Sequence, residues 1–135
     1  MLHLLLYFYN IGIMKKESII TALGALAQET RLDIFRYLVE VGPDGVPAGK
    51  ISERFDLPSP TLSFHLKTLQ QAGLLERKRQ SRSLIYSANF AAMNALLAYL
   101  TENCCGGHPQ ACTIPACEVQ SSTDTTTTTA TLKRA

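Results

Sequence analysis

The side chains most able to do chemistry in this 135-residue chain are four cysteines near its C-terminal end, Cys104, Cys105, Cys112 and Cys117. A disulfide framework would spread its cysteines through the folded domain and would need an oxidising compartment. Clustered thiolates instead favour soft metal or metalloid ions. The sequence therefore predicts a soft-ion site, and a reactive redox pair is the alternative.

The spacing of these cysteines bears on which ion they suit. Cys104 and Cys105 are adjacent, and Gly106 and Gly107 allow the chain to bend back so that Cys112 can reach them. Three thiolates suit As(III) or Sb(III), whose lone pair leaves no room for a fourth ligand. Adding Cys117 or His108 would allow a tetrahedral Zn(II) or Cd(II) site. The predicted ligands are Cys104, Cys105 and Cys112, with Cys117 a weaker candidate and His108 a loop residue.

A second group of functional side chains lies on a predicted helix within residues 57–75, LPSPTLSFHLKTLQQAGLL. Ser59 is the expected N-cap, Pro60 the first helical residue and Gly73 the residue that ends the helix. The apolar stripe of this helix is formed by Leu62, Leu66 and Leu69.

The polar face of this helix carries hydroxyls, an imidazole, an ammonium and one aromatic ring, but no carboxylate. Such a face suits a DNA groove, where phosphates repel carboxylates and base edges need short polar contacts. The residues expected to contact DNA from this helix are Ser59, Thr61, Ser63, Phe64, His65, Lys67 and Thr68.

The neighbouring segments complete a winged helix-turn-helix. Residues 48–55 predict a short helix before a tight turn, and residues 76–79 and 84–86 predict two strands joined by a polar turn at 80–83. The expected fold is therefore mainly α with a β-hairpin wing, a winged helix-turn-helix. The basic wing residues expected to contact DNA are Arg77, Lys78, Arg79 and Arg82.

Charge supports a nucleic-acid partner. The whole chain has a net charge of +2, yet residues 50–82 hold seven Lys and Arg against three acids, a local net charge of +4. A local basic excess of this kind is the electrostatic footprint of a phosphate-bearing partner.

These motifs resemble the ArsR/SmtB family of metal-responsive repressors over residues 18–112. The resemblance is carried by Ser63-x-His65-Leu66-Lys67-x-Leu69 with Ala72-Gly73-Leu74, and by the pattern Ala27-x-Glu29-x-Arg31-Leu32-x-Ile34-Phe35. Many members carry a glycine at the wing tip, which this chain lacks. The resemblance implies a repressor that binds an inverted-repeat operator as a homodimer.

The family's other sensor sites are absent here. Pro47, Gly49 and Ser52 stand where many arsenic sensors have cysteines, and residues 90–103 contain no His and only Glu102 where zinc sensors have ligands. What remains is similar to arsenic sensors with a Cys-Cys pair and a third Cys after the last helix. Cd(II) and Zn(II) stay possible effectors.

Three further helices are expected to position these sites. Residues 18–27 are apolar almost all round, which predicts a buried helix against a second subunit. Thr30 is expected to cap a helix at 31–41 whose core face holds Leu32, Phe35, Leu38 and Val39, and Asn89 to cap a helix at 90–103. The resemblance implies that the first and last of these helices pair across a two-fold axis in a dimer. The expected interface residues are Ile20, Leu23, Met93, Leu96, Leu97 and Leu100.

The predicted organisation has four parts: an extension at 1–14, the DNA-binding domain at 15–103, the Cys-rich segment at 104–117 and a disordered tail at 118–135. Residues 1–13 are apolar but too short for a membrane span, and they lack the features of a signal peptide. We interpret Met14 as the real start; an extension of the first helix or a partner-packing segment is the alternative.

The predicted function is a cytoplasmic repressor that As(III) or Sb(III) releases from DNA by drawing the tail onto the dimer helix and shifting the subunits. Alternatives are redox-sensing or Cd/Zn-sensing repressors, and a metal-storage module. A thiol enzyme such as an arsenate reductase is remote, because residues 106–120 contain no Arg or Lys to hold an oxyanion.

Overall fold

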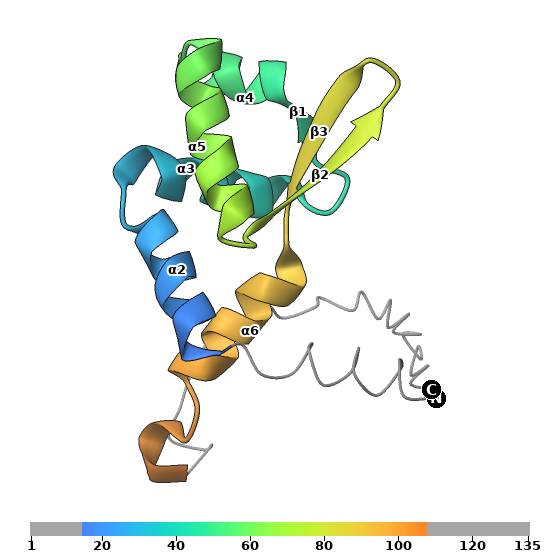
Figure 1. Ribbon diagram of the computed structural model, residues 1–135. Coiled ribbons are helices and arrows are strands. Elements are labelled where there is room, and N and C mark those ends of the chain that lie inside the picture. Colours follow the sequence, from blue (N-terminus) through green and yellow to red (C-terminus); the bar gives the residue numbers. More distant parts are fainter. Residues whose placement is uncertain (1–14, 108–135) are drawn as a thin grey trace, which may run out of the picture. The chain divides into compact units, whose positions relative to one another are not determined.

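The computed structural model describes residues 15–107, and the chain divides into two units, Met1–Glu102 and Asn103–Ala135. In the first unit, a small sheet lies at one side of a group of helices (Figure 1). The elements are α2 (Lys16–Leu26), α3 (Glu29–Val41), β1 (Val46–Pro47), α4 (Ala48–Phe55), α5 (Ser59–Gln71), β2 (Leu75–Gln80), β3 (Ser83–Ala88) and α6 (Phe90–Leu100). In the second unit, the described part holds a 3₁₀ turn, η1 (Cys104–Gly107). The predicted winged helix-turn-helix is confirmed.

Both ends of α5 are defined by backbone hydrogen bonds. The helix begins one residue earlier than predicted, because the Pro58 carbonyl accepts from the Leu62 N–H at 2.9 Å. The prediction that Ser59 is the N-cap is therefore wrong, and no side chain caps this end. At the other end Gly73 has a φ of +77°, as expected of the residue that ends a helix.

The C-terminal end of α5 forms a complete Schellman motif. The Leu74 N–H donates to the Leu69 carbonyl and the Gly73 N–H donates to the Gln70 carbonyl, both at 3.0 Å. This bonding satisfies carbonyls that would otherwise lack partners and turns the chain directly into β2.

The turn between α4 and α5 is held by two hydrogen bonds between the same pair of residues. The Ser52 hydroxyl donates to the Leu57 carbonyl at 2.6 Å, and the Leu57 N–H donates to the Ser52 carbonyl at 3.1 Å. Asp56 bridges the turn with a φ of +50°. The helix at residues 48–55 is confirmed with the predicted bounds.

The wing is a three-stranded antiparallel sheet in the order β1-β3-β2, with Arg77 opposite Tyr86 in the hairpin. The turn is Ser81-Arg82, two residues long, with a φ of +55° at Ser81. A non-glycine residue thus occupies the position where glycine is favoured. The sequence analysis missed β1, because two residues are too few to give a periodic signal.

The core gathers apolar side chains from α2, α3, α4, α5 and β3, and its fully buried large members are Ile34, Leu38, Ile51, Leu69 and Leu74. In α3, the expected core face needs one correction: Leu32 is 42% exposed, whereas Ile34 is buried. The two residues are about 200° apart around the helix axis, so they cannot share a face.

The predicted cap of α3 is also wrong. The helix begins at Glu29, and the Gln28 side-chain oxygen accepts from the Arg31 N–H at 2.8 Å. Thr30 lies inside the first turn. Because the amide of Gln28 reaches the third residue along, it takes the role that shorter side chains usually fill.

The start of α6 is confirmed and its end is not. The Asn89 side-chain oxygen accepts from the Ala92 N–H at 3.1 Å, and its amide nitrogen donates to the Gly73 carbonyl at 3.0 Å. One side chain thus joins the end of α5 to the start of α6. The helix stops at Leu100, three residues before the predicted end, and Cys104 and Cys105 begin η1.

Gly45, in the turn before β1, allows a test of this packing. Its φ is +69°, and a Cβ added there would lie 2.5 Å from the Tyr86 carbonyl oxygen. We expect Gly45→Ala to lower the free energy of unfolding by about 2–4 kcal/mol, from the left-handed backbone and the overlap together. Urea denaturation followed by circular dichroism measures this change.

Gly49→Ala is the matched control. No atom lies within 4 Å of the added Cβ, and the residue is helical. We expect this variant to keep or raise stability, by up to about 1 kcal/mol. Equal losses in both variants would contradict the close approach between Gly45 and β3.

Candidate nucleic-acid interface

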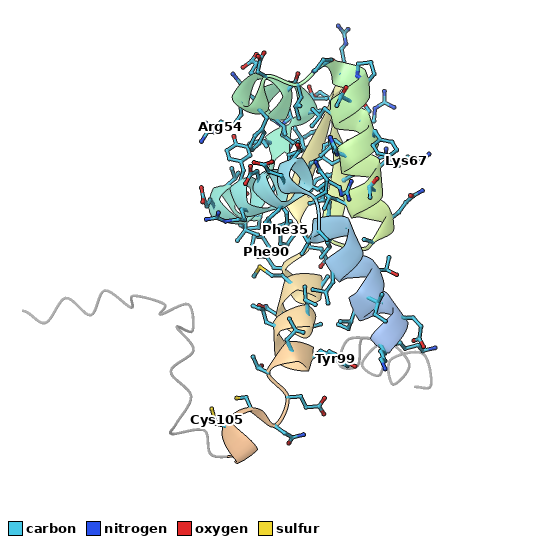
Figure 2. The ribbon with its side chains drawn as sticks, turned by 90° about the vertical axis from the view of Figure 1, so that its left-hand side faces the viewer. Phe35, Arg54, Lys67, Phe90, Tyr99 and Cys105 are labelled. Carbon is cyan, nitrogen blue, oxygen red and sulfur yellow. The ribbon has the colours of Figure 1, made fainter. Side chains whose placement is uncertain are left out.

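The outward face of α5 is polar, basic and free of carboxylates. Leu62, Leu66 and Leu69 are buried, which directs the opposite side of the helix to solvent. The predicted contact residues that this places at the surface are Ser59, Thr61, Ser63, Phe64 and Lys67. Figure 2 shows Lys67 pointing away from the domain. No Asp or Glu occurs between Ser59 and Gln71.

Two predicted contact residues lie at the border of that face. Thr68 is half-buried, and its hydroxyl donates to the Phe64 carbonyl at 3.0 Å, so its donor is used within the helix. His65 is also half-buried, and its Nδ1 atom has no hydrogen-bond partner among the described residues. Neither side chain is as available to a partner as Ser63 or Lys67.

Burial lowers the pKa of His65 below its usual value of 6.5, and the nearby Arg31 guanidinium lowers it further. Arg31 itself is fixed in place, because its Nε donates to the Ala25 carbonyl in the last turn of α2. The imidazole is therefore neutral at pH 7, and it contributes no positive charge to the face.

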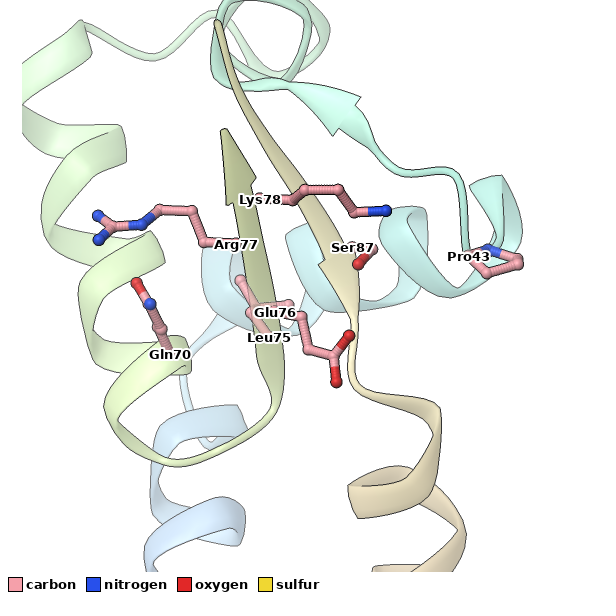
Figure 3. A pocket seen from close by; sticks show the side chains of 7 residues that line it. All are labelled: Pro43, Gln70, Leu75, Glu76, Arg77, Lys78 and Ser87. Carbon is pink, nitrogen blue, oxygen red and sulfur yellow. The ribbon is translucent and has the colours of Figure 1, made fainter. Parts of the chain in front are cut away.

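The basic residues of the wing are divided between its two faces. Figure 3 shows the Arg77 side chain extending from β2 toward Gln70 of α5, while Lys78 extends across β3 toward Pro43. Side chains alternate along a strand, so Arg79 is on the same face as Arg77. A depression of about 470 Å³ lies at this junction and is lined by Pro43, Gln70, Leu75, Glu76, Arg77, Lys78 and Ser87.

The cations of α5 and β2 form no ion pairs within residues 15–107. The one salt bridge in that range joins Lys50 to Glu53 at 3.6 Å on the surface of α4. Lys67, Arg77 and Arg79 are all exposed. Their charges are therefore available to an anionic partner such as phosphate.

One cation in the predicted basic segment belongs elsewhere. The Arg54 guanidinium lies 5.9 Å from the ring centres of both Tyr37 and Phe55. Arg54 and Lys67 are on opposite sides of the domain in Figure 2. The local charge of residues 50–82 thus overstates the charge of the α5 face.

Gln70 was not among the predicted contact residues. It lies beside Arg77 in the depression between α5 and β2, at the edge of the apolar stripe of α5.

The residues predicted for a dimer interface fall into two groups. Ile20, Leu23, Leu97 and Leu100 are exposed, on two helices that contact each other. Leu96 is only 6% exposed and Met93 packs against the core of the same chain, so both have little surface left for a partner. Tyr99 is an exposed aromatic on α6 that the sequence analysis did not include.

Two of the predicted ion ligands, Cys104 and Cys105, lie within the part of the chain that the structure describes. Cys104 is half-buried and Cys105 is exposed, and Cys105, Gly106 and Gly107 all have positive φ, which makes a tight turn directly after the pair. Cys112, Cys117 and His108 lie outside the described residues. Within residues 15–107, no three His, Cys, Asp or Glu side chains gather in a way that could hold a metal ion. None of the helices in this range is long and apolar enough to cross a membrane.

Comparisons with known proteins agree with the fold. Residues 26–78 match the model of a helix-turn-helix domain family. The chain is 37% identical over 59 residues to the uncharacterised transcriptional regulator YceK of Bacillus subtilis, a match covering 44% of this chain and 58% of YceK. It is 28% identical to the transcriptional activator HlyU of Vibrio cholerae, over 67% of this chain and 83% of HlyU.

Among solved structures, an ArsR-like transcriptional regulator from Rhodococcus sp. RHA1 superposes with a TM-score of 0.54 at 28% identity, covering 62% of this chain and 76% of that one. The chain is thus a winged helix-turn-helix protein similar to ArsR-like and HlyU-like regulators. These relatives are named as transcriptional regulators and not as enzymes, which agrees with the prediction against an enzyme.

The lowered pKa of His65 predicts a pH-dependent stability. The unfolded chain takes up a proton on this histidine at a higher pH than the folded chain does. Stability from His65 is therefore present above the usual value of 6.5 and is lost as the pH falls below it. We expect His65→Gln to flatten the fall in unfolding free energy between about pH 7 and pH 5, measured by urea denaturation.

Thr68→Ala, on the same side of α5, is the control and should keep the wild-type pH dependence. An unchanged pH dependence in His65→Gln would show that the environment of His65 does not disfavour its protonated form.

Proposed function

We propose that this protein is a homodimeric transcriptional repressor that binds an inverted-repeat operator through α5 and the wing. The observation that carries the proposal is the outward face of α5, which has hydroxyls and an ammonium, lacks carboxylates, and adjoins the cations of β2, which form no ion pair within the described chain. A helix of 13 residues is about 20 Å long and fits the major groove of B-DNA.

The roles of the individual residues follow from their positions. Ser59, Thr61 and Ser63 offer short hydroxyls to base edges, and Lys67 offers a charge to a base or a phosphate. Arg77 and Arg79 extend from the wing on the side of α5 and would contact phosphates flanking the groove. Lys78 and Arg82 would reach phosphates or the minor groove from the other face and the tip.

The dimer in this proposal covers the exposed apolar side chains of α2 and α6. Ile20 is 59% exposed, and Leu97 and Leu100 are also exposed. Burying them against a second copy removes apolar surface from water, which favours association. Two-fold symmetry then presents two copies of α5, and these match an inverted repeat.

DNA binding should depend steeply on salt, because each phosphate contact releases a counterion. We expect Arg77→Ala to weaken binding to operator DNA and to reduce the slope of log affinity against log salt by about one. Fluorescence anisotropy with DNA selected from a random pool measures both quantities.

Arg36→Ala is the matched control. Together with Arg54 and Tyr37, Arg36 lines a second depression, separate from the one between α5 and β2. This depression is on the side of the domain that faces away from Lys67. Its removal should leave the slope unchanged. A wild-type affinity that does not vary with salt would contradict the wing contacts.

We further propose that the effector is As(III) or Sb(III), held by Cys104, Cys105 and Cys112. The supporting argument is the chemistry of the donors, since adjacent thiols bind soft ions and a three-sulfur set suits a pyramidal one. The exposure of Cys105 and the tight turn through Gly107 favour access for an ion and a return of the chain toward the pair. Cd(II) or Zn(II) would use Cys117 or His108 as a fourth ligand.

The effector site and the dimer helix are neighbours in sequence, because Cys104 follows the last residue of α6 by four positions. Closing a ring of sulfur ligands there would constrain the chain that continues from Leu97 and Leu100. A change in subunit arrangement would then move the two reading helices out of register with the DNA. Typical coupling of about 1–3 kcal/mol corresponds to about 5–150-fold weaker DNA binding.

Cysteine variants test the effector. We expect Cys104→Ser and Cys105→Ser each to bind operator DNA like the wild type but to stay bound when arsenite is added, because a ligand is lost. Cys117→Ser is the control and should still be released. The measurement is anisotropy of labelled operator against arsenite, antimonite, cadmium and zinc.

Two outcomes would overturn this assignment. Release of a Cys104→Ser/Cys105→Ser double variant by arsenite would exclude the thiol pair as ligands. Release of the wild type by peroxide, with no response to any of the four ions, would identify a redox switch instead.

A further inference from the structure

The most exposed large apolar side chain in the described part of the chain is Phe64, at 64%. It does not belong to the α2 and α6 surface assigned to the dimer, because it is on the outward face of α5, next to Ser63 and one turn from Lys67. An exposed Phe forgoes the stabilisation that burial of its ring would bring. Folding of the single chain therefore does not explain its presence.

The position of Phe64 on α5 is well defined, although its ring is largely exposed. Its one aromatic neighbour among residues 15–107 is His65, with ring centres 6.0 Å apart and planes at 67°. His65 is itself half-buried beside Arg31, which is fixed to the end of α2. The Phe64 carbonyl accepts from the Thr68 hydroxyl, so the backbone at this position lies within a regular turn of α5. Apart from the edge contact with His65, the ring is open to a partner.

We infer that Phe64 is a specificity-determining residue that packs on the C5 methyl group of a thymine in the major groove. This inference rests on the proposed DNA binding. The thymine methyl is the apolar group that base pairs present on the major-groove edge, and a Phe ring is suited to contact it. The outward face of α5 has hydroxyls and an ammonium, no carboxylate and one exposed ring. This face matches the major groove of DNA at a thymine, which is anionic overall but apolar at the methyl group.

Two other occupants fit less well. Apolar wedges inserted between base steps are a device of minor-groove binders, whereas a helix of this size enters the major groove. A protein partner would be expected to cover a continuous apolar patch. Phe64 is instead bordered by Thr61, Ser63 and Lys67, which are polar and exposed, and Pro60 one turn earlier is too small to make such a patch with it.

The test removes the methyl group from DNA and the ring from the protein. DNA selected by the wild type from a random pool is remade with each thymine in turn replaced by deoxyuridine, symmetrically in both half-sites. At one position we expect binding to weaken about fourfold per half-site, the value of one buried methyl group. Phe64→Ala should bind the thymine and deoxyuridine DNA with equal affinity.

Three variants serve as controls: Lys67→Ala, Phe64→Leu and Phe35→Ala. Lys67→Ala should weaken binding to both DNAs by the same factor and reduce the salt slope by about one, because it removes a charge and not a methyl contact. Phe64→Leu should keep part of the methyl preference. Phe64→Ala should unfold at the wild-type temperature, because its ring is exposed, whereas Phe35→Ala, which removes a buried ring, should unfold at a lower one.

The outcomes separate this inference from the proposed function. If the wild type selects no DNA sequence, the proposed function and the inference both fail. If it selects an inverted repeat but shows no methyl preference at any thymine, or if Phe64→Ala keeps that preference, only the inference fails. Phe64 would then be available to a different partner.

Discussion

The arrangement depends on how α5 is fixed, because one helix must bury three leucines and leave the rest of its surface to solvent. Leu62, Leu66 and Leu69 pack into the core, so the rotation of the helix about its axis is determined. Its C-terminal end is closed by the Schellman motif, and Asn89 ties that same end to α6. A helix that contacts bases must be held in a fixed orientation, since base contacts depend on a defined register in the groove.

The cations of the domain also divide by position, because some make contacts within the chain and others are open to a partner. Arg31 is half-buried and donates a hydrogen bond to the Ala25 carbonyl at the end of α2. From there its charge helps to keep His65 neutral. Arg54 is held against Tyr37 and Phe55 on the far side. The cations of α5 and β2 lie beside each other on the side of the domain away from Arg54, and the described carboxylates leave them unpaired. The interface is therefore a smaller and more specific surface than the total charge suggests.

Two groups of exposed apolar side chains differ in their surroundings. Those of α2 and α6 are mostly aliphatic and include Tyr99, and they suit a contact between two copies of a chain. Phe64 stands by itself among polar neighbours, which suits contact with a single small apolar group. Leu96 and Met93 show how one helix serves both purposes, with these two facing the core of their own chain while Leu97 and Leu100 face outward.

Much of the local structure was determined by the sequence itself. The helix at Ala48–Phe55, the glycine that ends α5, the Asn89 cap and the hairpin all follow from short-range chemistry, and all were predicted. Tertiary structure decided the exposure of Leu32, strand β1 and the partial burial of His65. These features depend on contacts with residues that are distant in the sequence, and such contacts leave no signal in a local sequence pattern. His65 is the clearest case, because only the folded chain brings Arg31 beside it.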